Sequence, residues 1–198
     1  MTPDSHRNGK GSPPTGARGF SLFELLVVIS IISILAAVAL PRINLHQFRV
    51  DAGIRAVQSA LQQSARFAVQ RQHDVYVSFD VPGNRLLIVD DRNNDGVAAG
   101  VEKIQWRVLE DNVRFAVPPT SIGGNPLAAV AGGNLKLING MPTIIYRRDG
   151  AASTDLQVYI TSTRPDAGDF KALSVTRSTG HVDYYRRTPT GTWVKGGI

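Results

Sequence analysis

The sequence predicts an α+β protein in which a long N-terminal α-helix packs on antiparallel β-sheets. Three observations indicate this fold. Residues 20–40 are mainly apolar and carry a single charge, residues 41–73 carry an apolar stripe with helical spacing, and residues 74–198 contain short β-branched and aromatic runs separated by turns. A chain of 198 residues has room for one globular domain with appendages.

The first 19 residues are rich in Gly, Pro, Ser and Asn and show no apolar periodicity, so they predict a disordered leader. The leader is basic through Arg7, Lys10 and Arg18. The formal net charge is +6 for the whole chain and +4 after residue 19. This mild excess is not by itself a nucleic-acid-binding composition. The absence of cysteine excludes disulfides and thiolate metal sites.

The apolar segment 20–40 has the length of a membrane-spanning helix, because 21 residues at 1.5 Å each extend about 30 Å. The basic residues before it predict a cytoplasmic N-terminus and an exported C-terminal part. Its one charge is Glu24. An ionised carboxylate in hydrocarbon costs roughly 2.5–3.5 kcal/mol, so we expect Glu24 to have a partner or a function.

A basic leader that ends in Gly19, followed by Phe20 and by Glu24 within an apolar helix, resembles the class III signal of type IV pilins and pseudopilins. The resemblance implies that a prepilin peptidase removes residues 1–19 and N-methylates Phe20. It also implies that Glu24 pairs with the N-terminal amine of a neighbouring subunit, which offsets two charges at once. The mature protein would then be a single-pass inner-membrane protein with a periplasmic C-terminal domain.

Two other interpretations of this segment stay open. The first is an ordinary signal anchor in which Glu24 has no special role. The second is a cleavable secretory signal, since Ala37-Val38-Ala39 has the small-x-small form of a cleavage site behind an apolar region. Cleavage there would release an exported soluble β domain.

Pro41 follows the apolar segment, and we expect a kink there because proline removes a helical donor and clashes with the preceding turn. An amphipathic helix is then predicted over residues 41–73. Together with residues 20–40 it would form one helix of about 50 residues, roughly 80 Å long. The residues that recur every three or four positions are Val50, Ile54, Val57, Leu61, Ala65 and Ala68.

Residues 74–198 predict an antiparallel β domain, with turn residues between short strands and a long Gly-, Pro- and Ala-rich loop over 118–133. The resemblance implies that this domain is periplasmic. Strands are predicted at 75–79, 85–89, 102–109, 113–117, 135–138, 143–146, 155–161, 170–176 and 181–187.

The turn at Asp90–Gly96, which closes at Glu102, and the C-terminal hairpin at 175–182 make the chain similar to the GspH/FimT family of minor pseudopilins and minor type IV pilins. This resemblance implies a structural subunit of a type II secretion or type IV pilus filament. Its partners would be other pilin or pseudopilin subunits, the prepilin peptidase and the inner membrane, and it would require no cofactor.

Asp91, Asn93, Asp95 and Glu102 match the spacing of an EF-hand calcium loop, with Gly96 at the position of the sharp turn. Oxygen atoms at alternating positions can converge on Ca²⁺. The predicted flanks are strands and not helices, so the alternative is a polar hairpin loop without a metal.

Four cations near the C-terminus form a candidate nucleic-acid surface together with neighbouring aromatic residues: Arg177, Arg186, Arg187 and Lys195. This alternative function is that of a DNA-binding minor pilin. Charged residues that protect an edge hairpin from pairing would give the same pattern.

The four histidines show no metal-ligand spacing, and the sequence has no nucleophile elbow or P-loop motif. We therefore predict that the protein is not an enzyme. In this interpretation the catalyst is the peptidase that processes it.

Overall fold

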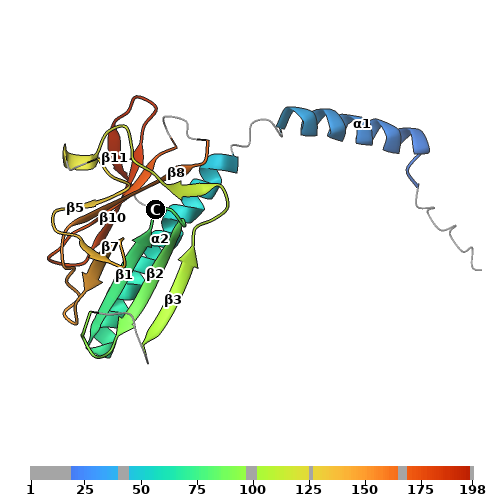
Figure 1. The fold of residues 1–198 in the computed structure, drawn as a ribbon. Coiled ribbons are helices and arrows are strands. Elements are labelled where there is room, and N and C mark those ends of the chain that lie inside the picture. The colour runs from blue at the N-terminus through green and yellow to red at the C-terminus, as the bar shows by residue number, and fades with distance from the viewer. Residues whose placement is uncertain (1–18, 40–44, 97–101, 125–126, 165–168, 197–198) are drawn as a thin grey trace, which may run out of the picture. The chain divides into compact units, whose positions relative to one another are not determined.

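The computed structural model describes residues 19–39, 45–96, 102–124, 127–164 and 169–196. The chain divides into two compact units, Met1–Ile43 and Asn44–Ile198 (Figure 1). The boundary separates the apolar helix from the amphipathic helix and the sheets. Pro41 and its predicted kink lie outside the described residues.

The first unit contains helix α1 (Leu22–Ala39). Ser21 immediately precedes it, and the Ser21 carbonyl oxygen accepts a hydrogen bond from the Leu25 amide at 3.0 Å. The hydroxyls of Ser30 and Ser33 donate to carbonyl oxygens one turn earlier at 2.8 Å, so these two polar side chains are satisfied within the helix.

The second unit begins with helix α2 (Leu45–Arg71). The predicted apolar stripe is confirmed as the buried face of this helix, with Val50, Ile54, Val57, Leu61 and Ala68 at most 1% exposed. Helical residues spaced by three and four lie on one face, which explains why one stripe enters the core.

The first sheet has five antiparallel strands in the order β3-β2-β1-β7-β6 (Figure 1). Strand β1 pairs with β2 along its whole length, from Asp74 opposite Asp91 to Asp80 opposite Arg85. The strands of this sheet are β1 (Asp74–Asp80), β2 (Arg85–Asp91), β3 (Lys103–Val108), β6 (Lys136–Ile138) and β7 (Met141–Tyr146).

The second sheet follows the order β11-β10-β9-β8-β4, and β5 also pairs with β8. A short 3₁₀ turn at Ile122–Gly124 precedes β5. The strands are β4 (Val113–Phe115), β5 (Val130–Gly132), β8 (Leu156–Ser162), β9 (Lys171–Val175), β10 (Val182–Arg187) and β11 (Trp193–Gly196).

One hydrophobic core joins α2 to strands of both sheets, and its largest fully buried side chains include Phe79, Leu61 and Ile160. The prediction of an N-terminal helix followed by antiparallel sheets is confirmed. The strand prediction was incomplete in two places. The predicted loop over 118–133 contains β5, and β11 was not predicted at all.

Candidate functional site

The predicted processing junction lies in an exposed, non-helical segment. Gly19 and Phe20 precede the first helical residue, and Phe20 is 76% exposed. A Cβ atom added at Gly19 would have no atom within 4 Å. Proteases cleave exposed segments that have little local structure, so the bond between Gly19 and Phe20 is placed where a peptidase can reach it.

Glu24 lies in the first turn of α1, three residues after Ser21. The pattern Ser-x-x-Glu at a helix start is that of a capping box, and a carboxylate there also interacts favourably with the helix dipole. The sequence analysis did not assign this pattern, although the spacing of three residues between Ser21 and Glu24 is visible in the sequence. Within the described residues, no cation lies within ion-pair distance of Glu24.

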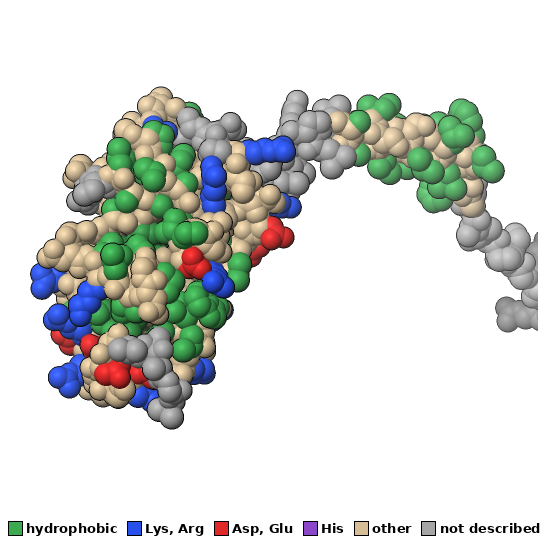
Figure 2. All heavy atoms as spheres, viewed as in Figure 1, with side chains coloured by type: hydrophobic (Ala, Val, Ile, Leu, Met, Phe, Trp, Pro, Cys, Tyr) green, Lys and Arg blue, Asp and Glu red, His purple; other side chains and the backbone are tan. Residues whose placement is uncertain are grey.

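Apolar side chains are exposed all around α1 and not on one face only. Figure 2 shows those on the side toward the viewer. Leu22, Ile29 and Ile34 are between 62% and 82% exposed. A helix that is apolar on every side normally lies in a membrane or in the core of a larger structure. None of the helices in the described ranges reaches the combination of length and apolarity needed to cross a bilayer.

The predicted calcium loop is held in place by Asp91, the last residue of β2, whose carboxylate is fully buried. Its Oδ2 atom accepts hydrogen bonds from the Tyr76 hydroxyl and, at 3.2 Å, from the Gly96 amide. Its Oδ1 atom accepts from the Asp95 amide at 3.2 Å. Asp91 therefore folds the loop back over β1 by hydrogen bonds within the chain.

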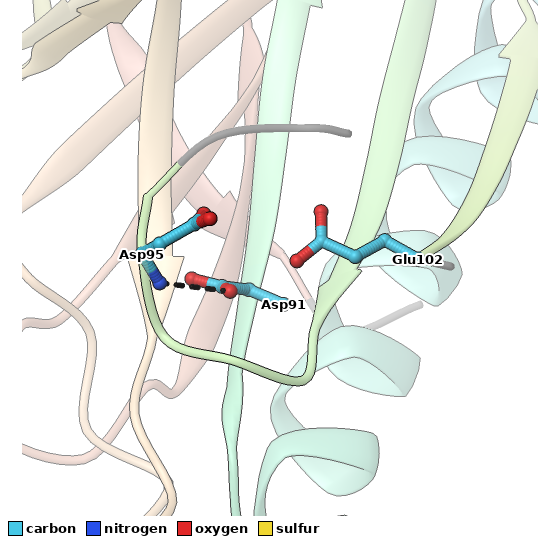
Figure 3. Close-up of side chains that lie close together, drawn as sticks. All are labelled: Asp91, Asp95 and Glu102. Atoms are coloured by element: carbon cyan, nitrogen blue, oxygen red, sulfur yellow. Dashed lines mark hydrogen bonds between the residues drawn. The ribbon is translucent and has the colours of Figure 1, made fainter. Parts of the chain in front are cut away.

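The carboxylates of Asp91, Asp95 and Glu102 point toward one another, with oxygen atoms within 4.8 Å (Figure 3). Asn93 is turned toward Asp95, because its amide nitrogen donates to Asp95 Oδ2 at 2.7 Å. The flanking elements are strands β2 and β3, as expected. The structure thus brings three of the four predicted ligands together, in an arrangement whose oxygen atoms suit a hard cation.

Tyr76 was not predicted as part of this loop. Its side chain reaches Asp91 because β1 and β2 are paired in register from Asp74 opposite Asp91. Burial, and then the hydrogen bond and negative charge of Asp91, raise the pKa of Tyr76 above its usual value near 10. The proton on this hydroxyl is therefore held more tightly in the folded protein.

The structure does not gather the four predicted DNA-binding cations on one surface. Arg186 and Arg187 are neighbours on β10, so their side chains leave opposite faces of the sheet. Lys195 forms an ion pair with Asp183 at 2.7 Å, which raises the pKa of its ammonium group. Arg177 lies in the turn between β9 and β10.

Two of the four, Arg186 and Lys195, do line one pocket of about 370 Å³ between α2 and the second sheet. Arg55 of α2 and Lys171 of β9 line the same pocket. Lys171 is paired with Asp51 at 3.3 Å. Arg55 and Lys171 were not among the predicted DNA-binding cations, because only the fold brings them beside β10.

Residues 15–40 match the family model described as the prokaryotic N-terminal methylation motif. No curated protein shows a significant sequence match. Two solved structures of the minor pseudopilin EpsH from the type 2 secretion system of Vibrio cholerae are similar to this chain. One is 12% identical, covers 74% of this chain and 95% of its own, and gives a TM-score of 0.41. The other is 16% identical, covers 73% and 92%, and gives a TM-score of 0.39.

The matched segment includes the three residues on which the resemblance was based, Gly19, Phe20 and Glu24. The resemblance to type IV pilin-like proteins is thus confirmed at the N-terminus, where this chain carries a prokaryotic N-terminal methylation motif.

Proposed function

We propose that this protein is a minor pilin-like subunit, a structural component of a type II secretion or type IV pilus filament. A prepilin peptidase cleaves between Gly19 and Phe20 and methylates the new N-terminus. The protein itself catalyses no reaction in this role. Its partners are the peptidase, the inner membrane and the neighbouring subunits.

The observation that carries this proposal is the methylation motif over residues 15–40, together with the exposed junction before α1. The apolar surface of α1 supports it, because such a surface needs lipid or other helices around it. In the inner membrane α1 contacts lipid, with the second unit in the periplasm. In the filament it packs against the helices of other subunits.

Glu24 then has a partner outside its own chain. Cleavage leaves a cationic amine on Phe20, and the carboxylate of a neighbouring subunit can pair with it. Both charges are unfavourable in an apolar environment when they are alone, so their pairing favours assembly and fixes the position of one helix against the next.

The first test is the mass of the N-terminal peptide of the mature protein, isolated from cells that contain the prepilin peptidase. We expect a peptide that begins at methylated Phe20. Gly19→Ala should prevent this cleavage. Because the structure has space for the added Cβ, loss of cleavage in this variant would show that the peptidase recognises Gly19 and would not be due to misfolding. A peptide beginning at Leu40 would show a discarded signal and overturn the proposal.

The second test separates the charge of Glu24 from its place in the capping box. Glutamine can occupy this position of a capping box but carries no charge. We expect Glu24→Gln and Glu24→Ala to reduce the fraction of methylated protein that co-sediments with filaments by about 100-fold, the equivalent of the roughly 2.5–3.5 kcal/mol for a charge in an apolar environment. If Glu24→Gln assembles normally and only Glu24→Ala fails, the residue acts as a cap and the pairing role is wrong.

A further inference from the structure

Strand β3 forms one edge of the five-stranded sheet and pairs with β2 along its length, from Asp90 opposite Lys103 to Arg85 opposite Val108. Over the described ranges, no strand pairs with its outer edge. Its six residues exceed the three of β6 and β4 and the four of β11, the other strands that end a sheet order. An edge of this length is a template for pairing with another chain.

The hydrogen-bond pattern shows which backbone groups face outward. The Leu109 amide, just after β3, donates to the Asn84 carbonyl oxygen of the β2 side at 2.9 Å. In an antiparallel pair, alternate residues direct both their amide and their carbonyl toward the same neighbour. The amides and carbonyls of Ile104, Trp106 and Val108 therefore point away from β2, at the outer edge.

The same three residues expose large apolar side chains on the face of the sheet that points away from α2. Ile104 and Trp106 are 45% exposed and Val108 is 72% exposed. Across from Trp106 and Ile104 on β2 lie Leu87 and Val89, which belong to a small buried cluster on this face. Hydrophobic side chains gathered at one edge in this way are typical of an interaction surface.

The opposite face of β3 carries Lys103, Gln105 and Arg107, toward α2. Hollows of about 140 and 290 Å³ lie between β3 and α2, and Gln63 and Arg107 line both. Neither Lys103 nor Arg107 forms an ion pair with another described residue. Asp90 and Glu110 also line these hollows, but Asp90 is paired with Arg71, so this face has both room and two cations outside any ion pair among the described residues.

We propose that the outer edge of β3 binds an extended strand of another protein in which acidic and apolar residues alternate. Backbone groups of Ile104, Trp106 and Val108 pair with the added strand, its apolar side chains cover theirs, and its carboxylates lie beside Lys103 and Arg107. Recognition of this kind obtains affinity from the backbone and specificity from alternate side chains. That the added strand comes from another filament subunit is an inference that rests on the proposed function.

The positive charge argues against a second copy of this chain as the occupant. Pairing of two β3 edges would bring Lys103 and Arg107 of both chains onto one face of the joined sheet. Like charges on neighbouring strands are destabilising. The same cations favour an acidic strand, so charge decides between the two partners.

The test uses the full chain in detergent and two fluorescein-labelled octapeptides, one alternating Glu with Val and the other Lys with Val. Fluorescence anisotropy measures their binding. We expect the Glu peptide to bind about tenfold more tightly, because the interactions with the two cations Lys103 and Arg107 change sign. Arg107→Glu should reduce or reverse this preference.

Val108→Pro removes an outward-facing amide without removing a bond to β2, because proline is tolerated at the outward positions of an edge strand. We expect it to weaken binding of the Glu peptide at least about tenfold. The matched control, Val108→Thr, keeps the amide and the β-branched side chain and should retain binding. Far-UV circular dichroism confirms that the variants are folded.

Equal binding of the two peptides, no binding of the Glu peptide, or binding that Val108→Pro leaves unchanged would overturn the proposal. Sedimentation of the unliganded chain as a dimer that Val108→Pro converts to a monomer would overturn it too, because a second copy would then occupy the edge. None of these measurements depends on processing at Gly19 or on Glu24. A failure here is thus distinguishable from a failure of the proposed function.

Discussion

Asp91 offers a test that separates the folding of the 91–102 loop from calcium binding. In Asp91→Asn an amide nitrogen replaces one carboxylate oxygen, at a fully buried position where both oxygens accept hydrogen bonds. At least one buried amide donor then faces another donor, at a cost of about 1–3 kcal/mol. Hydrogen bonds to a charged acceptor also weaken.

One effect opposes this loss, because the substitution removes a negative charge beside Asp95 and Glu102. Relief of repulsion toward Asp95, which is exposed, is worth less than about 1 kcal/mol, and relief toward the buried Glu102 adds to it. We therefore expect a net destabilisation of about 1–2 kcal/mol in calcium-free buffer. In urea this lowers the unfolding midpoint by roughly 1 M for a slope of 1–3 kcal/mol per molar.

The matched control is Asp95→Asn, which makes the same change of charge in the same cluster at an exposed position. We expect its stability without calcium to stay within about 0.5 kcal/mol of the unchanged protein. If calcium binds the loop, the unchanged protein gains about 2.7 kcal/mol at a concentration 100 times the dissociation constant, and both variants lose that gain. The loss without calcium separates Asp91 from Asp95, and the response to calcium tests the predicted metal site.

The assay is urea unfolding of the full chain in detergent, followed by circular dichroism with either calcium or a chelator present. Equal stability of Asp91→Asn and the unchanged protein in chelator would refute the inference that hydrogen bonds to Asp91 hold the loop. An unchanged midpoint on adding calcium to the unchanged protein would remove Asp91, Asn93, Asp95 and Glu102 from consideration as a metal site.

Three further predictions concern the second unit. The raised pKa of Tyr76 means that the folded state holds this proton more tightly, so the contribution of Tyr76 to stability is complete below pH 10 and is lost as the pH rises above 10. Tyr76→Phe should therefore make the fall of the unfolding free energy between pH 10 and 11 less steep. An unchanged slope would contradict the assignment. Within the described residues, no hydrogen-bond partner faces the fully buried Tyr146 hydroxyl, so Tyr146→Phe should leave the melting temperature at pH 7 unchanged or raise it, and a marked decrease would show an overlooked partner. Gly180→Ala should destabilise the protein by about 1–2 kcal/mol because of its φ of +63°, and further because the added Cβ would lie 2.3 Å from the Gly150 carbonyl oxygen. Gly123→Ala, at φ +64° with open space around it, should show only the cost of the backbone conformation. Equal losses in the two variants would exclude the steric clash at Gly180.

The elements that the sequence predicted correctly are those in which local pattern and tertiary environment agree. The stripe from Val50 to Ala68 became the buried face of α2 because a 3.6-residue period leaves it one face to bury. Strand β5 shows the opposite case. Its run Val130-Ala131-Gly132 has little intrinsic preference for a strand, and it forms because it pairs with β8, where Val130 lies opposite Val158.

The candidate sites divide in the same way. Spacing alone identified the loop of Asp91 and Glu102, since ligands close in sequence are recognisable by their pattern. The contact between Tyr76 and Asp91 depends on the register of two strands, which a sequence pattern does not fix when both faces of the sheet carry apolar residues. The four C-terminal cations seemed to form one surface in the sequence, but strand alternation places Arg186 and Arg187 on opposite faces.

Asp91 and Glu24 are both acidic residues that a motif identified, and their surroundings separate their roles. Asp91 has its hydrogen-bond donors within the chain, so its role in this fold is explained without any partner. Glu24 stands on a helix with apolar side chains on every side, and no cation among the described residues lies within ion-pair distance of it. A capping box explains why an acidic residue is tolerated at the start of α1, but glutamine would serve there as well. The proposed function assigns the negative charge itself a partner on another subunit, and comparing Glu24→Gln with Glu24→Ala tests this assignment.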